Sequence, residues 1–239
     1  MAEMFADAGY KTAYIGKWHL DGHGRSALAS DGFGAFYSVS TSGGVTELHR
    51  SVDTTELLPI DNTLGSFVDF AAMTVTPTGA GFGVVDTGAG FDLYRIEGGA
   101  DGVFNSVEGR TRIGAIRSGA TSIVDIAAIE ADPFTGQLHV IGATSAGGDR
   151  ALYTVAPGTG SATLVATLDD GGAISGDEFN ALAYDALGTT LYATRRAGGA
   201  DTLVTINTAS GVVTPVGFGT LLVNAANTNV QGMDFDSDG

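Results

Sequence analysis

The segment ALAYDALGTTLYATRRAGGADTLVTINTASGVVTPVG, residues 181–217, repeats the earlier segment AIEADPFTGQLHVIGATSAGGDRALYTVAPGTGSATLVA, residues 128–166. The two segments match in the order of their turn residues and apolar runs, so that Asp185 follows Asp132 by 53 positions. Positions later in the two segments match at a spacing of 51. A period of 51–53 residues predicts a structural unit that is copied along the chain.

Two further copies lie upstream, over residues 72–96 and 36–60. Each copy contains four short runs rich in Val, Leu, Tyr and Thr, separated by Gly-containing turns, and this composition favours β-strands. Four antiparallel strands in a unit of this length form the blade of a β-propeller, in which neighbouring blades bury each other's faces. We therefore predict an all-β propeller of about four such blades. A stacked β-solenoid, which uses shorter units, is the second choice.

The repeat also predicts the domain organisation. A propeller domain is expected over residues 27–239, and residues 1–26 are expected to form a short helix–strand appendage. The blades are placed near residues 31–68, 69–122, 123–176 and 177–228, with the start of a next strand or the closure of the ring at 229–239.

The last residues leave two alternatives open. GMDFDSDG at residues 232–239 matches ALAYDALG at residues 181–188 with an offset of 51. The copy that begins at Phe36 shows no clear first strand, so Met233 to Asp236 would complete the first blade and close a four-bladed ring. The alternative is a larger ring, of which this chain is a part.

Composition excludes several function classes. The chain has 27 acidic and 11 basic residues and a net charge of −16, so its surface repels nucleic-acid phosphates and anionic lipid. No stretch approaches the roughly 18 to 20 consecutive apolar residues of a membrane span. The absence of cysteine excludes disulfides, thiolate catalysis and Cys-ligated zinc.

The repeats resemble the Gly- and Asp-rich extracellular propeller repeats of bacteria, in which phrases such as FDSDG (residues 235–239) and LYAT (residues 191–194) mark the first turn and second strand. This resemblance covers about 200 residues, and it implies an extracellular or periplasmic location. The N-terminus itself does not have the basic and apolar regions of a signal peptide.

A second resemblance is to sulfatases, over residues 2–20. The family pattern Gly-Tyr-x-Thr-x-x-Ile-Gly-Lys-Trp-His is matched by Gly9, Tyr10, Thr12, Ile15, Gly16, Lys17, Trp18 and His19. The resemblance implies that Lys17 and His19 contact the sulfate group, where an ammonium and an imidazole neutralise charge on the sulfuryl oxygens. Leftover polar residues on an exposed strand are the alternative interpretation.

Sulfatases also depend on a Cys/Ser-x-Pro-x-Arg motif, which is converted to formylglycine, and on a carboxylate cage for calcium. This sequence contains no Cys and no Ser-x-Pro-x-Arg. Without that nucleophile and metal cage, the segment is expected to be catalytically incomplete.

Asp234, Asp236 and Asp238, followed by Gly239, form the D-x-D-x-D-G opening of a calcium loop, and we assign them as candidate ligands for Ca²⁺. A solvated Asp-Gly turn is the alternative, because the motif needs a later bidentate acid. No other cofactor is expected.

Other polar residues give weaker signals. The histidines His23, His49 and His139 show no metal-ligand spacing. The acids Asp169, Asp170, Asp177 and Glu178 could flank a glycosidic bond, although acids in loops are usually solvated.

The sequence therefore predicts a noncatalytic extracellular binding or structural propeller, with a protein or a polysaccharide as ligand. The alternative is a catalytically incomplete fragment derived from a sulfatase. A third interpretation, a propeller hydrolase, requires acids that converge on the central channel.

Overall fold

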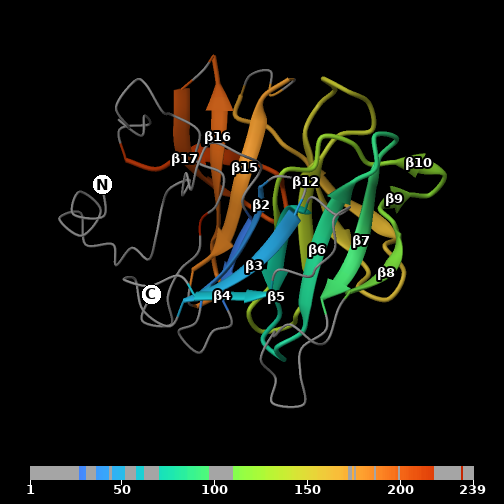
Figure 1. Cartoon of the computed structure of the whole chain (residues 1–239). Helices are drawn as coiled ribbons and strands as arrows, with labels where there is room; N and C mark the ends of the chain where they lie inside the picture. The colour runs from blue at the N-terminus through green and yellow to red at the C-terminus, as the bar shows by residue number, and fades with distance from the viewer. Residues whose placement is uncertain are drawn as a thin grey trace.

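The structure, a computed structural model, describes residues 70–96, 110–171, 174, 176–185, 187–198, 201–217 and 233, and the backbone alone of residues 27–30, 36–42, 45–51, 58–61 and 200. The described residues form strands and turns and contain no helix (Figure 1). Within them, no helix therefore has the length and apolarity needed to cross a membrane.

Sixteen of the strands form four antiparallel sheets, each with its strands in chain order, which we call blades one to four. Blade one contains β1 (Ala27–Ser30), β2 (Phe36–Ser42), β3 (Val45–Ser51) and β4 (Leu58–Asp61). Blade two contains β5 (Phe70–Val75), β6 (Gly81–Asp86), β7 (Phe91–Ile96) and β8 (Arg110–Ala115).

Blade three contains β11 (Ile129–Ala131), β12 (Leu138–Gly142), β13 (Ala151–Val155) and β14 (Ala162–Thr167). Blade four contains β15 (Glu178–Tyr184), β16 (Leu191–Ala197), β17 (Ala200–Ile206) and β18 (Val213–Pro215). The connection between blades two and three carries a two-stranded hairpin, β9 (Arg117–Ser118) and β10 (Thr121–Ser122).

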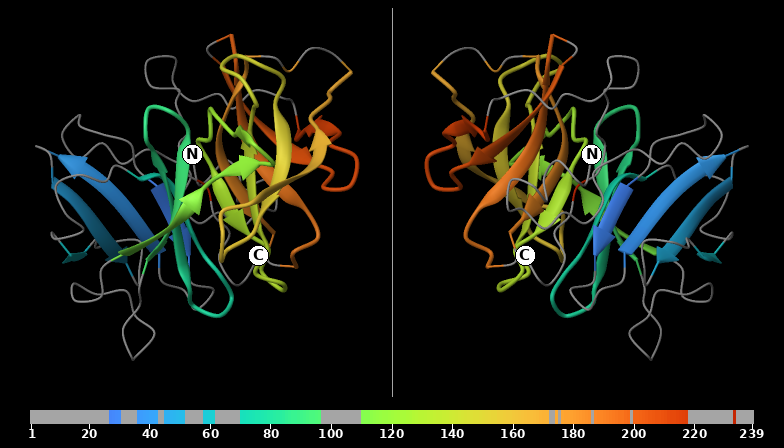
Figure 2. Two further views of the ribbon diagram at one scale, coloured as in Figure 1. Left: turned by 90° about the vertical axis from the view of Figure 1, so that its right-hand side faces the viewer. Right: turned by 90° about the vertical axis from the view of Figure 1, so that its left-hand side faces the viewer.

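The first strands of the blades are the inner strands, and they lie side by side in chain order. β1 contacts β5, β5 contacts β11, and β11 contacts β15. Figure 2 shows blade one (blue) and blade four (orange) on opposite sides of the molecule, with blades two and three between them. Burial falls from the inner to the outer strand, since β5 is buried throughout and β8 is partly exposed. The prediction of an all-β fold with four-stranded antiparallel blades is confirmed.

The core lies between the blades. Side chains on one face of blade two, among them Phe82 and Leu93, pack against Ile129 and Val140 of blade three. The opposite face of blade three contributes Ile141 and Leu152 to a second cluster, which includes inward-facing residues of blade four. Because successive side chains of a strand point to opposite faces, one apolar strand serves both interfaces, and all five residues of β12 are buried.

The Asp that recurs in blades three and four closes the turn after the inner strand. Asp132 Oδ1 accepts hydrogen bonds from the backbone N–H groups of Phe134 and Thr135, at 2.9 and 2.8 Å. Burial alone raises the pKa of Asp132, but these hydrogen bonds outweigh burial and lower the pKa. Asp185 closes its turn through later residues, since its Oδ1 accepts the backbone N–H groups of Thr189 and Thr190. The repeated Asp is therefore a structural turn residue.

The repeated glycines at 160 and 211 attach each blade to the preceding one. Gly211, with φ +74°, lies in the last turn of blade four, and its carbonyl accepts the Asp169 N–H at 3.0 Å. A Cβ at Gly211 would lie 2.2 Å from the Thr167 carbonyl oxygen of β14. Gly160, with φ +76°, makes the same approach to β8 of blade two, where the Ala115 carbonyl is nearest. The repeat therefore includes the contacts between neighbouring blades.

Blade one differs from the expectation in its first strand. Ala27–Ser30 form β1 and pair with β2, in register from Ala27 opposite Val39 to Ser30 opposite Phe36. The sequence interpretation assigned no strand to these residues. Blade one thus has four described strands, and its inner strand is β1. The predicted helix–strand appendage at residues 1–26 lies outside the described residues.

Candidate functional site

A cleft of about 810 Å³ opens at the end of the propeller where the inner strands β5, β11 and β15 begin. Its wall comes from blades two, three and four and from the connections between them. The lining residues are Ala71, Asp86, Gly88, Ala89, Gly90, Phe91, Val124, Asp125, Ile126, Ala127, Ala146, Gly147, Arg150, Gly176, Glu178, Phe179 and Asn180. A concave cleft of this size is a usual place for a ligand.

The ionisable side chains of the cleft are mainly acidic. Asp86, Asp125 and Glu178 are exposed residues, while the cation Arg150 is buried. Asp86 stays at the rim because its Oδ1 accepts the Gly88 N–H at 2.8 Å, which closes the β6–β7 turn. The accessible surface of the cleft is therefore negative.

Arg150 is held inside the wall by two acceptors. Its Nη1 donates to Asp125 Oδ2 at 2.8 Å, and its Nε donates to the backbone carbonyl of Asp177 at 2.6 Å. The Gly147 N–H also donates to Asp125 Oδ2, at 3.1 Å. The side chain of Arg150 is only 7% exposed and that of Asp125 is 34% exposed, so the guanidinium is shielded from water while the carboxylate reaches the surface.

Asp125 has an uncommon backbone conformation. Its φ of +57° is the only positive value among the non-glycine residues that the structure describes. Asp and Asn adopt this left-handed region more readily than most residues, because the short side chain bonds locally. The conformation brings the Asp125 carboxylate to Arg150 and to the cleft.

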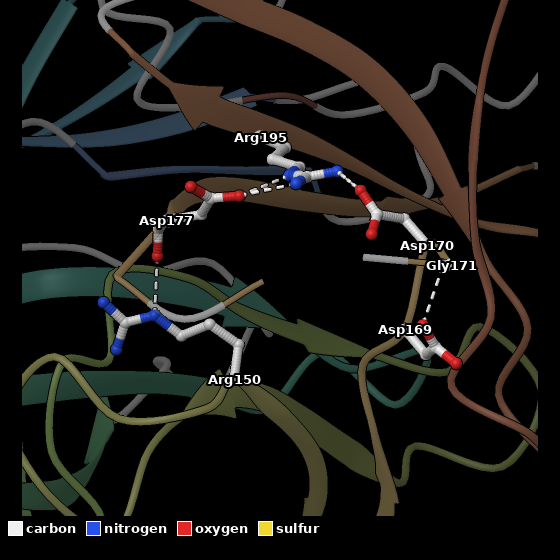
Figure 3. Close-up of polar contacts among 6 residues, drawn as sticks. All are labelled: Arg150, Asp169, Asp170, Gly171, Asp177 and Arg195. Carbon is white, nitrogen blue, oxygen red and sulfur yellow. Dashed lines mark hydrogen bonds and ion pairs between the residues drawn. The ribbon is translucent and has the colours of Figure 1, made fainter. Parts of the chain in front are cut away.

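A second arginine, Arg195 of β16, holds two of the predicted loop acids (Figure 3). Its Nε donates to Asp177 Oδ2 at 2.7 Å, and its Nη1 donates to Asp170 Oδ2 at 2.5 Å. Burial alone lowers the pKa of Arg195, but the hydrogen bonds to Asp170 and Asp177 outweigh burial and raise it. Asp170 and Asp177 therefore converge on a guanidinium.

The other two predicted loop acids have separate positions. Asp169 Oδ1 accepts the Gly171 N–H at 2.7 Å and closes a turn (Figure 3), and the Asp169 backbone pairs with blade four. Glu178 lines the cleft. The structure thus separates the four acids into a turn residue, two partners of Arg195 and one cleft residue.

His139 is a packing residue. It is buried, and its ring lies edge to face with Tyr184 at a centroid distance of 5.7 Å. Burial lowers the pKa of His139, and Asp132 only partly offsets the effect, so the imidazole is uncharged at neutral pH. Among the residues that the structure describes, no group of three His, Asp or Glu side chains has the spacing of a metal site.

The remaining predicted site residues lie outside the described part of the chain. These are the sulfatase-like residues Lys17 and His19, the candidate calcium ligands Asp234, Asp236 and Asp238, and His23. His49 lies on β3, of which the structure describes the backbone. Their assignments stay predictions.

Sequence interpretation missed Asp86, Asp125 and Arg150, although a signal for Asp125 was present. VDFAA at residues 68–72 and VDIAA at residues 124–128 each place an Asp shortly before an inner strand, and Glu178 takes the same place 53 residues after Asp125. One acid per repeat at one end of the inner strands predicts carboxylates that gather at the mouth of the channel.

Comparison with protein families gives no match. An Ulvan-active sulfatase of Formosa agariphila is 74% identical over 27 residues, which are 11% of this chain and 5% of that protein. The uncharacterized sulfatase YidJ of Escherichia coli K12 is 74% identical over 23 residues, again 5% of its length. The chain therefore shares with these sulfatases only a short stretch.

Solved structures resemble the whole fold. An engineered GH43 glycoside hydrolase matches with a TM-score of 0.59 and 12% identity over 91% of this chain and 46% of its own. A gluconolactonase from Xanthomonas campestris matches at 0.53 and 11% identity, over 91% of this chain and 68% of its own. At such low identity, these similarities show a propeller-like all-β fold and no shared activity.

Proposed function

We propose that this chain is a noncatalytic propeller module, located outside the cytoplasm, that binds a positively charged group of a partner protein in the acidic cleft. The supporting observation is the cleft of about 810 Å³ whose exposed ionisable groups, Asp86, Asp125 and Glu178, are carboxylates. The extracellular location rests on the resemblance of the repeats to extracellular propeller repeats.

The wall of the cleft already binds a cation of this kind. Arg150 is held by Asp125 and by the carbonyl of Asp177, so oxygen atoms of this wall already accommodate a guanidinium. Asp86 and Glu178 lie beyond this pair and face solvent. The net charge of −16 adds long-range attraction for a basic partner.

The positions of the acids favour binding over hydrolysis. Glycosidases use two carboxyl groups, one of which must protonate the leaving group. Asp170 and Asp177 are both bonded to Arg195, and Asp125 is bonded to Arg150. These three carboxylates neutralise cations of the protein itself, which does not fit the acid and nucleophile of a glycosidase.

The sulfatase-derived alternative has less support. It rests on a stretch of 27 residues, and Lys17 and His19 lie outside the described residues. The sequence contains no cysteine and no Ser-x-Pro-x-Arg to supply the formylglycine nucleophile.

Binding of an oligolysine peptide to the full chain, measured by isothermal titration calorimetry, tests the proposal. The double variant Asp86→Asn, Glu178→Gln is expected to bind about two- to thirtyfold more weakly, because each exposed charge pair contributes about 0.2–1 kcal/mol. Asn at position 86 keeps the acceptor for the Gly88 N–H. Binding is also expected to weaken as salt is raised.

The control removes two charges from the opposite end of the inner strands. Asp132→Asn, Asp185→Asn keeps the Oδ1 acceptors of both turns and changes the net charge by the same amount. This control is expected to bind like the parent chain. An equal loss in both double variants, or binding of a neutral xylo-oligosaccharide in place of the peptide, would contradict the proposal.

A further inference from the structure

Met233 is buried on blade four, and it lies on the face that points away from blade three. It is 4% exposed and clusters with Ala181 and Ala183 of β15 and Leu203 of β17. The neighbouring residues of β15, Leu182 and Tyr184, point the other way and join the cluster with blade three. Residues two apart on a strand share a face, which is why alternate residues of β15 belong to the two different clusters.

This contact repeats one that exists between blades three and four. Leu182, which precedes Met233 by 51 positions, packs in one cluster with Leu152 of blade three and with Ala128, the residue before β11. Ala128 precedes Ala181 by 53 positions, and Leu152 precedes Leu203 by 51. Met233 therefore has the same relation to blade four as the inner-strand residue Leu182 has to blade three.

Blade one does not use this residue. Its four strands are β1 to β4, and its inner strand β1 lies against β5 of blade two. Each of the four blades already has an inner strand. Met233 therefore occupies the place of a fifth inner strand.

We propose that this face of blade four, formed by Ala181, Ala183, Leu203, Tyr192 and Val216, is the docking surface for a fifth blade, whose inner strand contains Met233. The occupant is this chain's own segment from Gly232, which matches the inner strand of blade four in sequence. Under this proposal the propeller has a fifth position, and Met233 to Asp236 belong to that position instead of closing a four-bladed ring.

An extended protein tests this proposal directly. Gly239 follows Gly188 by 51 positions, so a second copy of residues 189–217 placed after Gly239 continues the repeat in register. In repeat proteins each added interface contributes to stability. The extended chain is expected to unfold about 5 °C or more above the 239-residue chain in thermal scans followed by circular dichroism.

Two variants connect any gain to Met233. Met233→Asp in the extended chain is expected to abolish the gain, and Val212→Asp, at a site that is 48% exposed, is expected to preserve it. Where Met233→Asp prevents folding, Met233→Ala is used, with loss of at least half of the gain expected. The same midpoint with and without the extension, an equal gain from a scrambled extension, or a gain insensitive to Met233 would overturn the proposal.

Discussion

Replacing Gly211 with alanine is expected to lower the free energy of unfolding by about 2–5 kcal/mol. A residue with a Cβ pays about 1–2 kcal/mol in the left-handed conformation that Gly211 adopts at φ +74°. The new Cβ would also lie 2.2 Å from the Thr167 carbonyl oxygen and 2.9 Å from the Ala166 side chain, and overpacking of this kind costs about 1–3 kcal/mol more. Urea unfolding followed by circular dichroism measures the loss.

Gly79→Ala is the matched control. Gly79 has φ +80°, but nothing lies within 4 Å of its Cβ position, so only the conformational cost applies there. The difference between the two variants measures the contact of the blade-four turn with β14 of blade three. Equal losses would show that the turn does not pack on the preceding blade, contrary to the arrangement described above.

Replacing Arg150 with methionine is expected to lower the free energy of unfolding by about 2–4 kcal/mol. Methionine keeps the apolar stem of the side chain but leaves the Asp125 carboxylate without its guanidinium partner. Removing one member of a buried ion pair costs about 3–5 kcal/mol, and the 34% exposure of the Asp125 side chain reduces this loss. The midpoint of urea unfolding at neutral pH reports the change.

Two further variants separate charge from packing. Adding Asp125→Asn to Arg150→Met is expected to recover part of the loss, because Asn tolerates the left-handed backbone and leaves no unpaired charge. Arg112→Met breaks the ion pair with Asp92, but Arg112 is 54% exposed, so a smaller loss is expected. Additive losses from Arg150→Met and Asp125→Asn would mean that the two side chains do not interact.

Much of the fold could be predicted because the repeat contains its own turn chemistry. Asp132 and Asp185 recur because a carboxylate bonds the N–H groups of its turn, and Gly160 and Gly211 recur because they contact the preceding blade. The turn hydrogen bonds are local, and the glycine contacts recur between neighbouring blades. The residues that make them therefore recur with a fixed period in the sequence.

Features that depend on distant pairing were missed. The four residues ALAS of β1 have a weak apolar pattern, and this strand is defined by its pairing with β2 and its contact with β5. The loop acids Asp170 and Asp177 were expected to be solvated, whereas both bond Arg195, which follows them by 25 and 18 residues on another strand. Contacts of this kind have no period and become visible only in three dimensions.

Amide chemical-shift mapping of the isotope-labelled chain with an oligolysine peptide most directly tests whether the cleft, where the inner strands begin, is a binding site. The largest shifts are expected at Gly88, Gly147 and Gly176, which line the cleft beside its carboxylates. Shifts centred on the turns at Phe134 and Leu187, at the opposite end of the inner strands, with none in the cleft, would contradict the proposed function.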